Sequence, residues 1–349
     1  MLSKLTPLLS PGPNGVQPPR IVLLASTSQG RKDLFGRMGL PVQLTGSSFP
    51  EDLDKDMHPI DYVLQTASGK AYSVMNTLLS QSEVSDSEKA EKSTNDFPDM
   101  IIAADTMVTL HHERYPTRGS DLVEDKYKII GKPDSNEDAI NTLLLLKGKR
   151  HFITTGVSLL LPLSPINTSK SDDILTSETN LENWLQKCLF KYDQTTLLSD
   201  KKYTNQSHSS LDPVVSVEIL TDTKLEQFLN QYPPNSHSNS LKSKPHPINT
   251  THSHCNESKW YHIQFTSTSS VEFDDVDIET IKSYVSTGEP LGKAGSYAIQ
   301  GVGGSLIKGM SGCYQNIVGF PSNKFGHLVS LLFFNTTDDP SPVIWTSKQ

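Results

Sequence analysis

The sequence predicts an α/β protein, because continuous apolar runs that suit buried strands alternate with segments of helical periodicity. The first unit opens with residues 21–25, an apolar run typical of a strand that is buried on both faces. It continues with residues 31–38, where apolar side chains recur at helical spacing, and with Gly39 as a candidate C-cap. A second helix is predicted over residues 61–79, and a second buried strand over residues 100–110.

Further elements are predicted from the same periodicities and from cap residues. Ser135 can cap a helix over Asn136–Leu146, and Asp138 in its first turn suits the helix dipole. The other predicted elements are strands over 42–45, 152–161, 260–265 and 271–273, a polar hairpin over 111–128, and helices over 277–286 and 323–333.

Charge and cysteine content exclude some classes of protein. The 349-residue chain has a net charge of −8, which argues against a general nucleic-acid-binding protein. Its three cysteines, Cys188, Cys255 and Cys313, are odd in number and far apart. They offer no disulfide framework and suit a reducing, cytoplasmic compartment. No apolar run is long enough to span a membrane.

Two internal segments and both ends are predicted to lie outside the packed domain. Apolar residues make up 35% of the chain, which is low for a compact domain. Residues 1–19 are Pro-rich and are expected to form a disordered leader, and residues 336–349 a tail. Residues 81–99 and 162–258 are expected to be flexible insertions, because they are rich in polar residues and poor in apolar ones.

The long insertion contains islands of different composition. Residues 181–190 place apolar side chains on one helical face, residues 213–220 are predicted to form a strand, and residues 223–231 a short helix. Docking on the domain is the default expectation for these islands, and docking on a partner is the alternative. His252, His254 and Cys255 are residue types that bind metals, but their spacing matches no complete zinc pattern.

The loop between the first strand and the first helix could bind an anion. Ser26, Thr27 and Ser28 are hydroxyl residues, one of which can cap the helix. The helix N-terminus presents free N–H groups and a positive dipole end, and Arg31 and Lys32 are expected to add mobile positive charge. An ordinary strand–helix turn is the competing interpretation, and this stretch alone slightly favours it.

Asp105 is a candidate site residue on physical grounds. It interrupts the apolar run 100–110, and burying an ionised carboxylate costs on the order of several kcal/mol unless the group is paired or bound to a metal. The competing interpretation is a strand-end aspartate that caps a loop. Lys70 lies within a predicted helix, where a solvated lysine is the commonest outcome.

Motifs in the same order along the chain resemble those of the Maf family of nucleoside triphosphate pyrophosphatases. The opening motif, Ser-x-Ser-Pro-Arg-Arg-x-Glu-Leu-Leu after a strand, corresponds to residues 26–35, with Gln29 for the proline and Gly30 for the first arginine. The most specific match is KAGSYAIQG at residues 293–301. Further matches are Ala104-Asp105-Thr106, Gly131-Lys132-Pro133, the segment ending at His151, Thr287-Gly288-Glu289-Pro290, and residues 314–321, which correspond to the family's last strand and turn.

The resemblance implies a fold, an activity and a cofactor. The fold is one Maf-like domain over residues 20–335, interrupted by the two insertions, with an elongated mixed sheet flanked by helices and two lobes around a central cleft. The activity is hydrolysis of a nucleoside triphosphate to the monophosphate and pyrophosphate, which removes unwanted nucleotides from the pool. The cofactor is a divalent metal cation, Mg²⁺, Mn²⁺ or Co²⁺.

The resemblance also implies the roles of individual residues. Asp105 is the general base, and Glu51 and Asp105 hold the metal. His151 is a catalytic candidate, but a structural imidazole beside the next strand is the stronger expectation. The substrate-binding residues are Ser26, Arg31, Lys70, Lys132 and Gln300, with the cations on the triphosphate and the glutamine amide on the base.

Positions 30, 106 and 300 divide the family by substrate. Thr106 and Gln300 match members that act on dTTP and UTP, whereas Gly30 replaces their arginine. Arg31 or Lys32 is a candidate to occupy the gap. The alternatives are a 7-methyl-GTP-type pyrophosphatase and a catalytically idle nucleotide-binding regulator of cell division.

The catalytic set favours the enzyme, because Asp105, Glu51, Lys70 and Lys132 are all present. The expected partner is a nucleoside triphosphate, with neither nucleic acid nor membrane. A homodimer and a protein partner that binds through residues 162–258 are left open.

Overall fold

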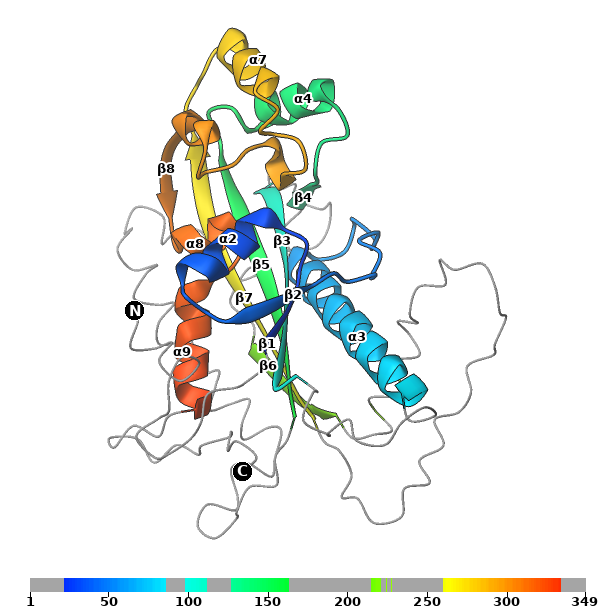
Figure 1. Ribbon diagram of the computed structural model, residues 1–349. Coiled ribbons are helices and arrows are strands. Elements are labelled where there is room, and N and C mark those ends of the chain that lie inside the picture. The colour runs from blue at the N-terminus through cyan, green and yellow to red at the C-terminus, as the bar shows by residue number, and fades with distance from the viewer. Residues whose placement is uncertain are drawn as a thin grey trace, which may run out of the picture.

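The computed structural model describes residues 22–85, 98–111, 127–162, 215–220 and 260–333, together with Lys224 and Gln227. These residues form a mixed sheet of eight strands with helices on both faces, which confirms the predicted α/β class (Figure 1). Six strands follow the order β2-β1-β3-β5-β7-β6, while β4 pairs with β3 and β8 with β7. The strands are β1 (Val22–Ala25), β2 (Val42–Thr45), β3 (Met100–His111), β4 (Tyr127–Ile130), β5 (Arg150–Pro162), β6 (Val215–Leu220), β7 (Trp260–Phe273) and β8 (Ile307–Ser311).

The first strand and helix form as predicted. β1 pairs in parallel with both β2 and β3. Helix α2 (Gln29–Arg37) begins two residues before the predicted start and is closed by the predicted glycine, whose φ is +70°. The N–H of Gly39 donates to the Gly36 carbonyl, and the N–H of Leu40 donates to the Phe35 carbonyl. This pair of bonds satisfies the carbonyl groups at the helix end.

The long antiparallel strands β3, β5 and β7 run through both lobes (Figure 1). The predicted strands at 260–265 and 271–273 are one continuous strand, β7. The hydroxyl residues between them continue the strand because neighbouring groups satisfy them. Thr268 bonds to Thr154 at 3.1 Å, and the Ser269 hydroxyl donates to the Cys313 carbonyl at 3.1 Å.

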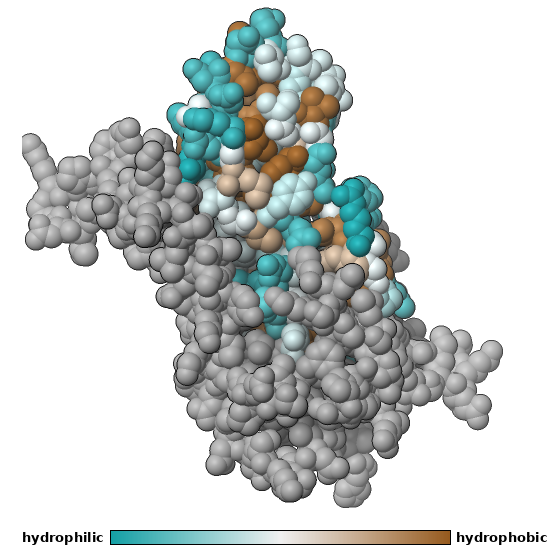
Figure 2. All heavy atoms as spheres, turned by 90° about the vertical axis from the view of Figure 1, so that its left-hand side faces the viewer, coloured by the Kyte–Doolittle hydropathy of each residue, from teal (hydrophilic) through white to brown (hydrophobic). Residues whose placement is uncertain are grey.

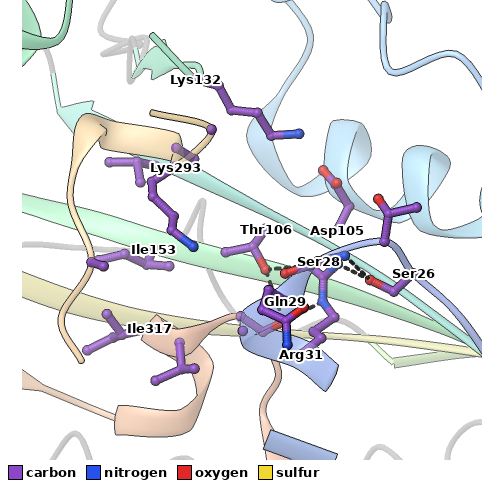
Figure 3. A pocket seen from close by; sticks show the side chains of 18 of the residues that line it. Ser26, Ser28, Gln29, Arg31, Asp105, Thr106, Lys132, Ile153, Lys293 and Ile317 are labelled. Atoms are coloured by element: carbon purple, nitrogen blue, oxygen red, sulfur yellow. Dashed lines mark hydrogen bonds between the residues drawn. The ribbon is translucent and has the colours of Figure 1, made fainter. Parts of the chain in front are cut away.

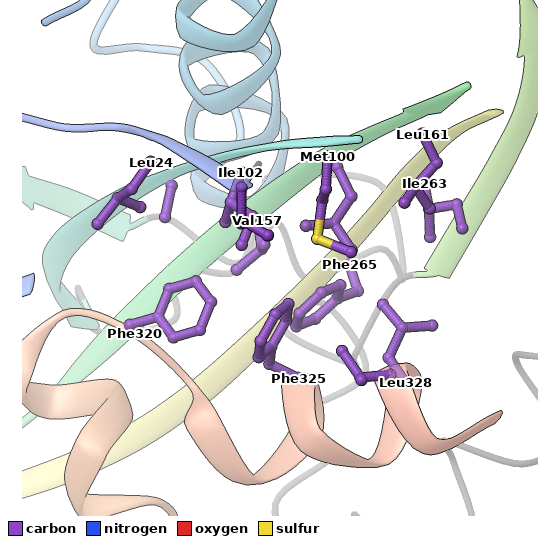
Figure 4. Packing of buried hydrophobic residues seen from close by; sticks show 14 of the residues in the cluster. Leu24, Met100, Ile102, Val157, Leu161, Ile263, Phe265, Phe320, Phe325 and Leu328 are labelled. Atoms are coloured by element: carbon purple, nitrogen blue, oxygen red, sulfur yellow. The ribbon is translucent and has the colours of Figure 1, made fainter. Parts of the chain in front are cut away.

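Helices cover both faces of the sheet at the β1 end. Helix α3 (Pro59–Ser85) packs on one face through residues such as Ala71 and Met75. Helix α9 (Ser322–Phe333) covers the other face, where Phe325 and Leu328 lie under the strands (Figure 4). Fully burying one such side chain contributes about 1.5–3 kcal/mol. This core fixes β1 and β3, the strands that lead into the predicted site.

A second, smaller cluster builds the other lobe. Helices α4 (Asn136–Leu146) and α7 (Ile278–Ser286) pack on the far ends of β3, β5 and β7, together with the 3-10 helices η2 (Ala294–Ser296) and η3 (Val302–Leu306). Ser135 caps α4 by accepting the Asp138 N–H at 3.1 Å, as predicted. On the face seen in Figure 2, apolar side chains of this lobe are interspersed among polar ones.

Two expectations about secondary structure were wrong. Helix α3 continues to Ser85, so residues 81–85 are helical, because Gln and Glu are good helix formers. Tyr314–Val318 is helix α8 and not a strand, and its buried Asn316 amide donates to Ile153 O and Ser269 Oγ, both at 3.0 Å. Gln300 lies in a turn. Among the described residues, no helix is both long and apolar enough to cross a membrane.

The strand predicted inside the long insertion is part of the sheet. Val215–Leu220 forms β6, which pairs antiparallel with β7, and Val217 and Leu220 are buried. This strand therefore docks on the domain, as the default expectation held. The helix predicted over 181–190 and the His252–Cys255 group lie outside the described residues, as do the two ends of the chain.

Candidate active site

A cleft of about 370 Å³ opens between the two lobes. Its walls come from the β1–α2 loop, the middle of β3, helix α3, the turn after β4, the segment around η2, and α8. Every residue that the sequence placed in the site lines this cleft: Ser26, Gly30, Arg31, Glu51, Lys70, Asp105, Thr106, Lys132 and Gln300.

Four of these residues form a chain of alternating charges. The Lys70 ammonium lies 2.8 Å from Asp105 Oδ1 and 2.7 Å from Glu51 Oε1. The other Glu51 oxygen lies 3.0 Å from the Lys132 ammonium. Lys70 is buried, so the solvated-lysine interpretation is wrong. Asp105 lies in the middle of β3, opposite Gly156 of β5, so it does not cap a loop at a strand end.

The close approach of α3 to the sheet brings Lys70 to Asp105. A Cβ atom at Gly156 would lie 2.7 Å from the carbonyl carbon and oxygen of Val63, so only glycine leaves room for the helix there. Val63 precedes Lys70 by seven residues, about two helical turns, which places the two on the same side of α3. The contact therefore holds Lys70 against the strand that carries Asp105.

The charges around Glu51 determine its protonation. Partial burial disfavours the ionised carboxylate, but the ammonium groups of Lys70 and Lys132 outweigh burial and lower the pKa of Glu51 to about 2. Glu51 is therefore ionised at neutral pH. It joins two cations from different parts of the cleft wall.

Arg31 is fixed by hydrogen bonds, although the sequence predicts a mobile side chain. Its Nε donates to the Gly319 carbonyl at 2.8 Å, and its two terminal nitrogens donate to Ser26 Oγ and Thr106 Oγ1, each at 3.1 Å. Burial lowers the pKa of Arg31, while the charges of Asp105 and Glu51 oppose that effect. Because its guanidinium is buried and bonded on three sides, Arg31 does not swing into the gap at Gly30.

The N-terminus of α2 opens into the cleft without a side-chain cap. Ser28 is the N-cap residue, but its hydroxyl makes no capping bond. The Ser28 N–H donates to Ser26 Oγ at 3.2 Å, and Ser28, Gln29 and Gly30 line the cleft. The predicted hydroxyl cap is therefore absent at Ser28. Uncapped N–H groups at a helix start favour an anionic ligand.

His151 is structural, as expected. It is fully buried, its Nε2 lies 2.8 Å from the Tyr297 hydroxyl, and it does not line the cleft. Burial lowers the pKa of His151 to about 4, with a smaller opposing effect from the backbone of Lys149. The imidazole is therefore neutral at physiological pH.

Sequence reasoning missed three groups at the site. Lys293 lines the cleft, and its side chain points into it (Figure 3). Lys293 lies in the motif that matches the family most specifically, but the resemblance implies no role for it. The Gly319 carbonyl and the Thr155 hydroxyl, which is 2.9 Å from Thr106 Oγ1, help to fix Arg31 and Thr106. Neither gave a signal in the sequence, because their partners are distant along the chain.

The carboxylates of the cleft are suited to a hard divalent cation. Glu51 and Asp105 bond to the same ammonium and so lie close together. Among the described residues, no group of three or more His, Cys, Asp or Glu side chains could hold a metal by itself. Two carboxylates that share an ion with substrate phosphates are the usual arrangement for Mg²⁺.

Comparison with known proteins identifies the family. A model of the family described as "Maf-like protein" matches residues 21–201 and 236–332. A dTTP/UTP pyrophosphatase of Ruminiclostridium cellulolyticum is 26% identical over 313 residues, which cover 90% of this chain and 96% of that protein. A probable bifunctional dTTP/UTP pyrophosphatase/methyltransferase protein of Homo sapiens is 25% identical over 90% of this chain and 32% of its own length. A dTTP/UTP pyrophosphatase of Clostridium tetani is 48% identical over 69 residues, 20% of this chain and 36% of its own. The chain belongs to the Maf family.

Proposed function

We propose that this protein hydrolyses nucleoside triphosphates to the monophosphate and pyrophosphate, with UTP and dTTP as preferred substrates. The observation that carries the proposal is the chain of charges Asp105–Lys70–Glu51–Lys132 in the cleft. It brings a candidate base, two carboxylates for a metal and two cations for phosphate into one site. The names of relatives that align over most of this chain support the same activity.

The triphosphate would bind where positive charge and free N–H groups converge. Lys70 and Lys132 would contact phosphate oxygens as point charges, in exchange for part of their bonding to Glu51. The uncapped start of α2 supplies neutral N–H donors. Arg31 adds fixed positive charge at the floor of the cleft. Binding of the polyanion would thus free Glu51 oxygens.

Glu51 and Asp105 would hold a divalent cation together with the substrate phosphates. When bound, the ion neutralises phosphate charge and polarises the phosphorus centre that is attacked. Exchange of Lys70 and Lys132 onto phosphate leaves the two carboxylates available to it. Binding of the substrate would therefore favour binding of the metal, and binding of the metal would favour binding of the substrate.

Asp105 would act as the general base. Its carboxylate accepts a proton from a water molecule, the water oxygen attacks the α-phosphorus, and the bond to the bridging oxygen breaks so that pyrophosphate leaves. Lys70 holds Asp105 at 2.8 Å in the middle of a rigid strand, so the base is positioned before the substrate arrives. Gln300 at the cleft wall and Thr106 beside Arg31 are the residues that we assign to base selection.

Pyrophosphate release from a nucleotide panel tests the proposal. The panel contains UTP, dTTP, CTP, ATP, GTP and 7-methyl-GTP, each with Mg²⁺ and with excess chelator. We expect metal-dependent release, fastest with UTP and dTTP. Binding of nucleotides without release from any of them would instead support a catalytically idle regulator. Preference for 7-methyl-GTP would overturn the substrate assignment alone.

A further inference from the structure

Lys293 is a cationic side chain of the cleft that forms no ion pair with the described residues. It is half-buried, and its side chain points into the cleft (Figure 3). Lys70 and Lys132 are each paired with Glu51, and Arg31 is bonded on three sides. Within the described part of the chain, no acidic side chain pairs with Lys293. Its ammonium can therefore meet a ligand without first breaking an ion pair.

The backbone around Lys293 is fixed to the wall of the cleft by a hydrogen bond and by a close glycine contact. The Gly295 N–H donates to the Gly131 carbonyl at 3.1 Å, which ties this segment to the turn that carries Lys132. Gly295 has a φ of +74°, and a Cβ atom there would lie 3.0 Å from Val108 Cγ2, so both the conformation and the contact require glycine. The segment is thus held against the Val108 end of the cleft.

That end of the cleft differs in chemistry from the Asp105 end. Asp105 and Ser26 lie on one side of Thr106 in Figure 3, and Lys293 lies on the other with Ile153 and Ile317. Val108, three residues beyond Asp105 on β3, also lines the cleft and lies beside Gly295, two residues from Lys293. Three strand residues span about 10 Å. An α-phosphate held at Asp105 would therefore place the base of the same nucleotide over the apolar wall, within reach of Lys293.

We infer that Lys293 selects the base by donating a hydrogen bond to an exocyclic carbonyl oxygen. This inference rests on the proposed function, since it assigns the base of a bound nucleoside triphosphate to the Val108 end. An ammonium group has three donors and no acceptor. Uracil and thymine carry a carbonyl oxygen at position 4, where cytosine carries an amino group. Lys293 therefore favours UTP and dTTP over CTP.

Two variants test the assignment in the full-length chain. Lys293→Met removes the donor, and Lys293→Gln replaces it with an amide that both donates and accepts. Lys282→Met is the matched control, because Lys282 is exposed on α7 and pairs with Glu279 outside the cleft. We expect Lys293→Met to lower kcat/KM for UTP by roughly 10- to 100-fold while CTP changes little, and Lys293→Gln to reduce the UTP-to-CTP ratio as well. The control should keep the wild-type ratio.

Binding measurements separate base recognition from phosphate binding and from turnover. Calorimetry with UMP, CMP and the base-free probe tripolyphosphate should show that wild type prefers UMP, that Lys293→Met loses this preference, and that tripolyphosphate binds both proteins equally. Equal weakening of all three probes would overturn the inference in favour of a phosphate contact. A wild-type protein that binds UMP and CMP equally, or a variant that changes nothing, would also overturn it. Failure of wild type to release pyrophosphate would contradict the proposed function, whereas the UMP and CMP comparison would still decide the role of Lys293.

Discussion

The Lys70 ammonium lies 2.8 Å from the Asp105 carboxylate, and the two residues come from a helix and a strand that pack directly on each other. Lys70 also holds Glu51 at 2.7 Å, so one buried ammonium orients both carboxylates of the cleft. Removing one partner of such a buried group leaves uncompensated charge behind.

Asp105→Asn should abolish turnover while the protein still folds and binds nucleotide. The amide keeps the shape of the side chain but cannot accept a proton from water, and the loss of general-base catalysis lowers kcat by roughly 100- to 10,000-fold. Steady-state pyrophosphate release and nucleotide binding are measured on the same preparation. Asp134→Asn, at an exposed aspartate, is the control and should behave like wild type. Undiminished metal-dependent release by Asp105→Asn would rule out Asp105 as the base.

Glu51→Gln should flatten the dependence of stability on acid pH. The pKa of Glu51 is lowered from 4.5 to about 2 in the folded protein, so the folded state binds this proton less readily than the unfolded chain. Its stabilisation is complete above pH 4.5 and is lost as the pH falls toward 2. Urea unfolding at pH 6 and pH 3 should show a smaller difference for the variant than for wild type. The effect is moderated by solvent, since the Glu51 side chain is 42% exposed.

The exposed Glu137→Gln serves as the comparison for this experiment and should retain the wild-type pH dependence. If Glu51→Gln loses stability with acid just as wild type does, the ion pairs of Glu51 do not stabilise the fold.

Gly301→Ala should destabilise the segment that carries Gln300. A Cβ atom at Gly301 would overlap Glu289 Oε1, and the other Glu289 oxygen accepts the Gly303 N–H at 2.8 Å. The methyl group must displace this carboxylate, which we expect to cost about 1–3 kcal/mol in urea unfolding. The kcat/KM for UTP should fall together with the stability of the protein. Gly309→Ala, where the new Cβ meets nothing within 4 Å, should leave both quantities unchanged.

Gly30→Arg should sharpen the preference for UTP and dTTP if the missing arginine contacts the base or its phosphate in other family members. Arg31 is fixed elsewhere, so a new side chain at position 30 would not compete with it. A charged hydrogen bond contributes roughly 10- to 100-fold in kcat/KM. A Cβ atom at Gly30 lies 3.3 Å from the Val318 carbonyl oxygen, so Gly30→Ala measures the effect of that tight contact alone.

The comparison uses kcat/KM for UTP, dTTP, CTP and 7-methyl-GTP on both variants and wild type. Equal changes for all four substrates would mean that position 30 does not distinguish the bases in this protein.

Local sequence signals predicted most elements, whereas most residues of the candidate site came from the resemblance to the Maf family. Ser135 and Gly39 marked helix ends correctly because caps depend on neighbouring backbone groups. Asp105 was found because a carboxylate inside an apolar strand needs a partner. That partner, Lys70, could be placed only by the family's motif, since the contact spans 35 residues.

The remaining features depend on contacts that no local pattern encodes. Arg31 was expected to be mobile, yet it is bonded to Gly319, which lies 288 residues further along the chain. The resemblance predicts a strand over the residues that form helix α8. Five residues are too few to show the helical periodicity that would correct it, and the buried Asn316 amide bonds to groups of β5 and β7. The sequence predicts two strands where β7 is one, because a run of hydroxyl residues resembles a loop when the hydrogen-bond partners of its side chains are unknown.

The products formed from UTP test the central claim most directly. Wild-type protein with UTP and Mg²⁺ is sampled over time, and nucleotides and phosphates are separated and quantified. Attack at the α-phosphorus in the Asp105–Lys70 cleft predicts UMP and pyrophosphate in equal amounts, with neither formed by Asp105→Asn. Formation of UDP and inorganic phosphate, or recovery of intact UTP, would contradict it.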